Sequence, residues 1–147
     1  MTGALTPRFQ RFAFLLALAA LALVPAAAET RDGVFIHVSH GPEAPHRPLM
    51  VLHMANMMAV DHPVLADFDI QAVHAVLRDA KDVQFAHFPS LKTRLAELVK
   101  RGFTLLACPN CLQAAGKSPA DLAPGIQPAE KAQFFRFTSG RIITLDY

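Results

Sequence analysis

Cysteine is scarce in this chain: its 147 residues include only two, Cys108 and Cys111. A structural zinc site needs four closely spaced cysteine or histidine ligands, and no paired histidine spacing accompanies these two residues. A disulfide between residues three apart closes too small a loop to stabilise a fold appreciably. The pair therefore indicates sulfur chemistry or metal binding, with two inert thiols or a fixed disulfide as the alternative.

Long apolar runs are also scarce. The main one, Phe12–Val24, is too short to span a bilayer comfortably, and nothing later in the chain resembles a membrane span. Arg8 and Arg11 precede this run, and three alanines ending at Ala28 follow it. This layout is typical of a secretory signal peptide, so we expect residues 1–28 to be one, cleaved after Ala28.

Cleavage there leaves residues 29–147, a length that suits a single domain. We expect this domain to be periplasmic or secreted, where conditions are oxidising, and to keep no stable membrane anchor. An uncleaved N-terminal anchor is the alternative. No cysteine directly follows the apolar run, so a lipid-anchored form is not indicated.

The mature chain lacks net charge. The full sequence has 14 Lys and Arg against 12 Asp and Glu, and residues 1–28 contain two arginines and no acid. Removing them leaves 12 basic against 12 acidic residues, which is formally neutral. Charge therefore gives no support to a nucleic acid or an anionic membrane as a partner, and we expect neither.

Apolar patterning predicts an α/β domain with no internal repeat. Short β-like runs alternate with helical stretches, which is typical of a parallel sheet covered on both faces. The stretch 45–59 is apolar nearly all round and is predicted to be a buried helix, whereas residues 79–89 read as irregular. The predicted strands are 33–38, 64–68, 103–107 and 141–145, and the other predicted helices are 70–77, 90–102, 109–115 and 128–135, with a helical turn at 118–122.

The cysteines lie where a predicted strand passes into a helix. Pro109 suits the first helical position, which puts both sulfurs on the first turn, in the positive field of the helix N-terminus. Cys108 is expected to be the more exposed thiol and the better nucleophile, with Cys111 as the resolving thiol. Ser39 and His40 follow the first strand and would line the same crevice if the two strands were neighbours.

Other chemistry has weaker signals. There is no GxSxG motif, glycine-rich phosphate loop or paired-carboxylate signature, and no cofactor is expected. A thioredoxin is disfavoured because the CPNC motif comes late and follows Ala107 rather than an aromatic residue. Asp67 and Asp69 are interpreted as a solvated loop.

The methionines have two interpretations. A cluster that includes His53, Met54 and His62 contains soft ligands that favour Cu(I). Packing of Met50, Met54, Met57 and Met58 into the core is the preferred interpretation, because they share helical spacing and methionine commonly fills gaps.

The chain resembles the DsrE-like proteins, a sulfur-relay group that includes the DsrE, DsrF and DsrH subunits. The resemblance runs from about Gly33 to Tyr147, on the segments DGVFIHVSHGPEAPHRPLMVLHMA, GFTLLACPNCLQAAG and FFRFTSGRIITLDY. It implies a three-layer α/β/α fold around a mainly parallel, five-stranded sheet, assembled as a homo-oligomer, a trimer or hexamer. It also implies that Cys108 carries sulfur as a persulfide and exchanges it with sulfur-donor and sulfur-acceptor proteins or small thiols.

Two features depart from the relay subunits: the expected export, and the second thiol, Cys111. The leading hypothesis is an exported DsrE-like protein of sulfur metabolism, possessing sulfurtransferase or carrier activity. In it Cys108 accepts sulfane sulfur, Cys111 resolves the persulfide, and Ser39 and His40 line the site. The alternatives are a soft-metal module that binds Cu(I) through Cys108, Cys111 and either His40 or a methionine, or a structural subunit without chemistry.

Overall fold

The computed structural model describes residues 30–147, so the predicted signal peptide lies outside the described residues. The strands of this part form one five-stranded sheet in the order β4-β3-β2-β1-β5, and every neighbouring pair is parallel. The strands are β1 (Gly33–Val38), β2 (Val64–Phe68), β3 (Thr104–Ala107), β4 (Ile126–Pro128) and β5 (Ile142–Asp146).

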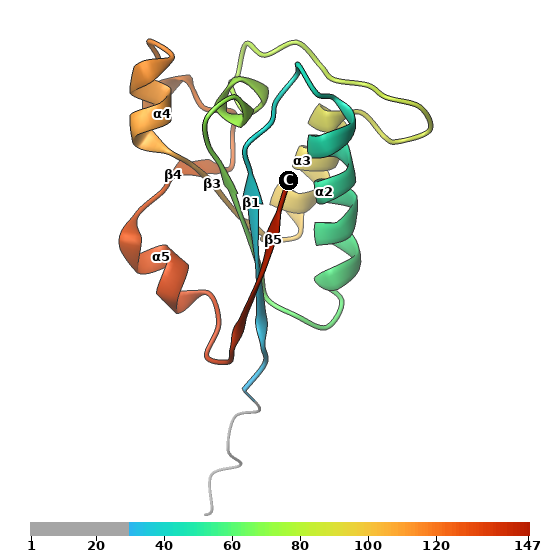
Figure 1. The fold of residues 1–147 in the computed structure, drawn as a ribbon, viewed down its shortest axis with the longest axis vertical. Coiled ribbons are helices and arrows are strands. Elements are labelled where there is room, and N and C mark those ends of the chain that lie inside the picture. The colour runs from blue at the N-terminus through green and yellow to red at the C-terminus, as the bar shows by residue number, and fades with distance from the viewer. Residues whose placement is uncertain (1–29) are drawn as a thin grey trace, which may run out of the picture.

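Helices cover both faces of this sheet, which confirms the predicted three-layer α/β/α class. Figure 1 shows α2 and α3 on one face and α4 and α5 on the other. The helices are α2 (His46–Met58), α3 (Leu91–Lys100), α4 (Pro109–Ala114) and α5 (Lys131–Arg136), with 3₁₀ turns η1 (Ala72–Ala75) and η2 (Pro119–Asp121). Among residues 30–147, no helix is long and apolar enough to cross a bilayer.

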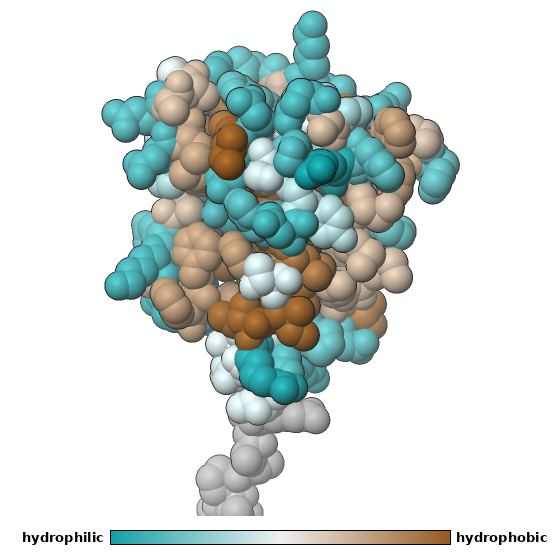
Figure 2. Space-filling view, viewed as in Figure 1, coloured by the Kyte–Doolittle hydropathy of each residue, from teal (hydrophilic) through white to brown (hydrophobic). Residues whose placement is uncertain are grey.

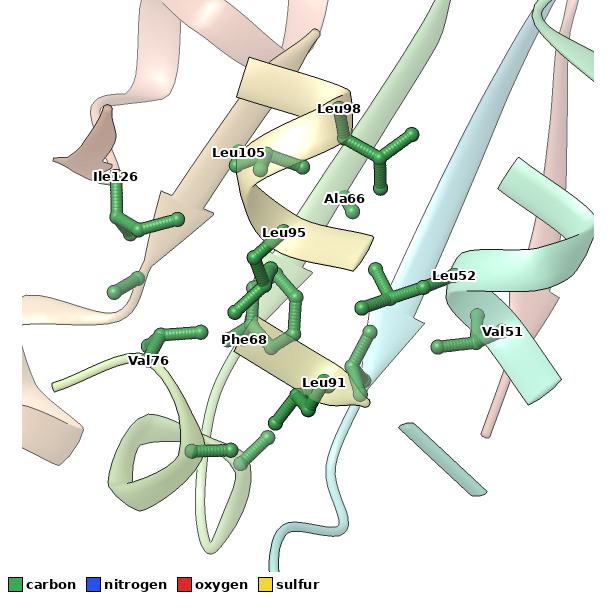
Figure 3. Close-up of a cluster of buried hydrophobic side chains, with 14 of the residues drawn as sticks. Val51, Leu52, Ala66, Phe68, Val76, Leu91, Leu95, Leu98, Leu105 and Ile126 are labelled. Atoms are coloured by element: carbon green, nitrogen blue, oxygen red, sulfur yellow. The ribbon is translucent and has the colours of Figure 1, made fainter. Parts of the chain in front are cut away.

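The main core lies between the sheet and the α2/α3 layer. Phe68 is fully buried there, and Figure 3 shows its ring beside Leu91 and Leu95 of α3. The sequence dictates α3 well: the Ser90 side chain accepts a hydrogen bond from the Thr93 N–H at 3.4 Å, and leucines at helical spacing face the core. Burying these side chains supplies most of the driving force for folding.

The opposite layer is thinner and less closed. Phe35 of β1 meets Phe134 of α5 edge to face, with ring centroids 5.7 Å apart, but no residue of α5 is buried. Figure 2 shows hydrophobic side chains gathered over the lower end of β5, where Ile142 is 44 % and Ile143 51 % exposed. Edge strand β5 therefore presents apolar surface to solvent.

The prediction that residues 45–59 form a helix buried all round is wrong in one respect. The helix forms, but only the side toward the sheet is buried. Met50 and Met54 are half-buried and Met57 is 57 % exposed, so these three are not core residues as we expected. The reason is the position of α2 in an outer layer, where the core covers a single side of a helix.

Two shorter segments also differ from prediction. The helix expected at 70–77 is a single 3₁₀ turn, and the one expected from Pro128 begins at Lys131. Pro128 instead ends β4, a strand that the sequence pattern did not predict. Three residues are too few to show a periodic pattern, and β4 is defined only by its pairing with β3.

Candidate functional site

The cysteine pair lies at the carboxyl edge of the sheet, as predicted. Cys108 directly follows β3 and is the N-cap of α4, with Pro109 at the first helical position. Its backbone N–H donates to the Phe68 carbonyl oxygen at 3.0 Å, which ties the cysteine to the end of β2. The buried ends of two central strands therefore hold this thiol in place.

The two sulfurs are arranged asymmetrically. The Cys111 thiol donates to Cys108 Sγ at 2.7 Å, and the Cys111 backbone N–H donates to the same sulfur at 3.3 Å. Cys108 Sγ thus accepts two hydrogen bonds, the arrangement that suits a thiolate. Both residues are free thiols and partly exposed.

Cys111 is held in its protonated form. Burial raises the pKa of its thiol, and the hydrogen bond to Cys108 raises it further. A backbone hydrogen bond at Ile70 acts in the opposite direction, and the charge of Asp69 adds to the rise. Ile70 has φ 44°, a left-handed conformation that a β-branched residue rarely adopts. Such strain is common at functional sites, and here it lies beside the thiol pair.

A histidine between two carboxylates lies along the same edge. His37 near the end of β1 contacts Asp146 of β5 through Nδ1 at 2.7 Å and Asp69 after β2 through Nε2 at 2.8 Å. Burial alone would lower the pKa of His37, but the hydrogen bonds to Asp69 and Asp146 together raise it. The imidazolium form can donate to both carboxylates at once.

Asp67 is the most perturbed acid of the site. It lies inside β2 and is only 9 % exposed. Its neighbour on strand β1 is His37, and its neighbour on strand β3 is Leu106. Burial and then the charge of Asp69 raise the pKa of Asp67 to about 6, and the charge of His37 partly offsets them. Within residues 30–147, neither Asp67 Oδ1 nor Asp69 Oδ1 has a hydrogen-bond partner.

The interpretation of Asp67 and Asp69 as a solvated loop is therefore wrong for Asp67, because β2 carries it into the sheet, whereas Asp69 does lie in the loop that follows and is half-buried. Sequence reasoning also missed His37 and Asp146. The available signal was that each of these polar residues sits at or just beyond the end of an apolar strand. Recognising them as one set required the strand order, which brings the ends of β2, β1 and β5 side by side.

Ser39 and His40 lie one strand farther from the cysteines than we expected when we predicted that they share a crevice with Cys108. That prediction was conditional on β1 and β3 being neighbours, and β2 lies between them. The Ser39 hydroxyl donates to the Tyr147 carbonyl oxygen at 3.1 Å and lies 3.1 Å from His40 Nδ1. Among residues 30–147, no three histidines, cysteines or acids converge on a metal position.

Comparisons with known proteins agree with this fold. The sequence model of the DsrE/DsrF-like family matches residues 32–144. A protein of unknown function from Methanobacterium thermoautotrophicum, MTH1491, has a similar structure, with a TM-score of 0.56 at 21 % identity. The alignment covers 80 % of this chain and 99 % of that one, and at this identity it shows the fold alone. A comparison with curated proteins found no significant match.

Proposed function

Since this chain belongs to the DsrE/DsrF-like family, which is associated with sulfur relay, we propose that it is a sulfane-sulfur carrier with a built-in release step. Cys108 accepts the sulfur atom and Cys111 is the resolving thiol. The observation that carries the proposal is the asymmetry of the pair: Cys108 Sγ accepts both hydrogen bonds, and Cys111 is their donor.

The proposed loading step is an exchange at sulfur. The Cys108 thiolate attacks the outer sulfur of a donor persulfide, forms a new S–S bond and expels the donor as its thiolate. The product is a Cys108 persulfide. An acceptor thiolate can then attack the outer sulfur, which transfers it and restores the Cys108 thiolate with no net oxidation of the protein.

The alternative to transfer is discharge by Cys111. Its thiolate attacks the inner sulfur of the Cys108 persulfide, closes the Cys108–Cys111 disulfide and expels hydrosulfide. Two thiols are oxidised and the sulfane sulfur is reduced, so a dithiol reductant is needed to reset the protein. The sulfurs are 2.7 Å apart, about 0.7 Å more than a disulfide bond, so closure needs little movement.

Protonation of Cys111 decides between these two outcomes. Because burial raises its pKa whether or not Cys108 carries sulfur, the attacking thiolate is a small fraction near neutral pH. The persulfide then survives long enough to meet an acceptor. As the pH rises toward the raised pKa, the thiolate fraction grows, and discharge overtakes transfer.

Mass spectrometry tests the loading step. We expect the C111S variant, after treatment with a sulfane-sulfur donor such as polysulfide, to gain one or more sulfur atoms on the peptide that contains Cys108. The matched C108S variant should gain much less on Cys111, because burial, the largest cause of the raised pKa of this thiol, does not depend on Cys108. An unmodified Cys108 in the C111S protein, or equal loading of both variants, would refute the proposal.

Release of sulfide tests the discharge step. In the loaded wild-type protein, the rate of sulfide release should follow the fraction of Cys111 that is thiolate. At pH values below the Cys111 pKa, this rate should rise about tenfold for each pH unit. The C111S variant should show no such rise. A pH-independent release, or an equal release from C111S, would show that Cys111 is not the resolving thiol.

Export and assembly are further parts of the proposal. We propose that the chain acts in the periplasm or outside the cell after loss of residues 1–28, as a homo-oligomer that meets its donors and acceptors by collision. The layout of the N-terminal sequence supports export, and the half-exposed Ile142 and Ile143 on edge strand β5 support assembly. N-terminal sequencing of the exported protein and light scattering of the purified one test these two points.

A further inference from the structure

The side of α2 that faces away from the sheet has an unusual composition. His46, Met50, His53 and Met57 recur there every three or four residues, and Met54 lies beside them. The buried residues of α2 occupy the opposite side of the helix: Pro48, Leu49, Val51, Leu52 and Ala55. Arg47 and Asn56 also lie outside the buried side of α2, and Arg47 is exposed. The outer side of a helix normally carries mostly charged residues, so a row of methionine and histidine along it needs another explanation.

This surface forms one wall of a groove of about 670 Å³. The opposite wall is the irregular segment 85–89, which Figure 1 shows running past the N-terminal end of α2. His46 stacks on Phe85 with ring centroids 5.0 Å apart, and His53 meets Phe88 edge on at 6.0 Å. These ring contacts hold the segment beside the helix and shield the methionines on that side.

The groove offers soft donors and no hard ones. None of its lining residues is an acid, and the only charged one, Arg94, is paired with Glu97 at 2.7 Å. Calcium and magnesium require oxygen ligands, so this lining excludes them. Thioether sulfur and imidazole nitrogen favour soft monovalent ions, which also carry the smallest charge into an apolar groove.

We propose that this groove binds one Cu(I) or Ag(I) ion through Met50, His53, Met54 and Met57. Their spacing of i, i+3, i+4 and i+7 places neighbouring Cβ atoms about 5–6 Å apart on one helix face. Side chains of this length can converge on one ion from such positions. The proposal is independent of the thiol chemistry, because α2 and the helix that begins after Cys108 cover opposite faces of the sheet.

Aromatic residues, methionine and arginine are enriched at protein interfaces, so a protein partner is the competing occupant of this groove. The contribution of the helix favours an ion. The helix contributes only the two side-chain types that ligate soft metals. A protein occupant remains a distinguishable outcome of the experiment below.

Methionine methyl NMR with Ag(I) provides the test. Ag(I) is redox-inert, and a C108S/C111S background removes the competing thiols. We expect the ε-methyl signals of Met50, Met54 and Met57 to shift until one equivalent has been added. Met58, which packs against the core outside the groove, is the internal control and should not move.

Substitutions identify the ligands. Leucine is close to methionine in size, so M50L/M54L/M57L should keep the fold, checked by circular dichroism, and lose the one-equivalent binding. M58L should bind as the parent does. Anaerobic competition with a Cu(I) chelator should rank the variants in the same order.

Three outcomes would overturn the proposal. The first is no methyl shift with Ag(I), and the second is unchanged binding in the triple leucine variant. The third is that the methyl signals of the groove do not shift with Ag(I) but do shift with protein concentration. That result would assign the surface to contact between copies of the chain.

Discussion

Replacing Asp67 with asparagine should stabilise the protein much more at pH 8 than at pH 4. Asp67 is 9 % exposed, and burial followed by the charge of Asp69 raises its pKa from 3.8 to about 6. A carboxyl whose pKa is higher in the folded state favours folding while protonated and opposes it when ionised. Its stabilising effect is complete below pH 3.8 and is lost as the pH rises through about 6.

The magnitude follows from the two pKa values. The rise to about 6 corresponds to a penalty of about 3 kcal/mol on the ionised form. At pH 8 the full penalty applies, whereas at pH 4 it is only about 0.5 kcal/mol, because most of the carboxyl is protonated in the folded state. The stabilisation by D67N should therefore be about 2.5 kcal/mol larger at pH 8 than at pH 4. Any pH-independent cost of burying an amide cancels in this difference.

Urea unfolding of both proteins at the two pH values measures the effect. The dependence of the free energy of unfolding on urea should be the same for both proteins, because the variant exposes the same surface. D61N is the matched control, because it makes the same chemical change at an exposed acid that precedes β2, on the opposite edge of the sheet. An equal effect of D67N at pH 4 and pH 8 would refute the conclusion that Asp67 is a buried carboxyl with a raised pKa.

Three further substitutions probe the histidine, the core and a helix cap. Hydrogen bonds to two carboxylates outweigh burial and raise the pKa of His37, so its stabilisation is complete below about pH 6.5 and is lost as the pH rises through the raised value. H37Q should flatten the loss of stability above pH 6.5 in urea titrations, and an unchanged slope would contradict this. F68A should lower the free energy of unfolding by about 3–5 kcal/mol in the same assay, since the ring of Phe68 is fully buried. A loss below about 1 kcal/mol would contradict this packing. S90A should cost about 1 kcal/mol through loss of the α3 cap, and an unchanged free energy of unfolding would contradict the capping role of Ser90.

The local features of the site were readable from the sequence. The continuous apolar run before Cys108 predicted a central strand, and Pro109 and Gly116 bounded the short helix after it. These signals depend on residues that are neighbours along the chain, so periodicity and turn chemistry were enough. The alternation of strands and helices likewise fixed the fold class, which the all-parallel sheet confirms.

The acid–histidine set required long-range information. Asp69 and Asp146 are separated from His37 by 32 and 109 residues, and only parallel pairing of β1 with both β2 and β5 brings them together. The same strand order places β2 between β1 and β3, which separates Ser39 and His40 from the cysteines. No local pattern specifies which strands become neighbours.

The sequence by itself determined that α2 is a helix rich in methionine and histidine, and that Cys108 lies at the end of a buried strand. Only the tertiary structure decided that the methionine side of α2 faces away from the core and that Asp67 is buried, with no partner for its Oδ1 in the part of the chain that the structure describes. Helical periodicity depends on backbone geometry within a few residues. Which side of a helix or strand faces the core depends on the elements that pack against it, and in this fold those elements come from distant parts of the chain.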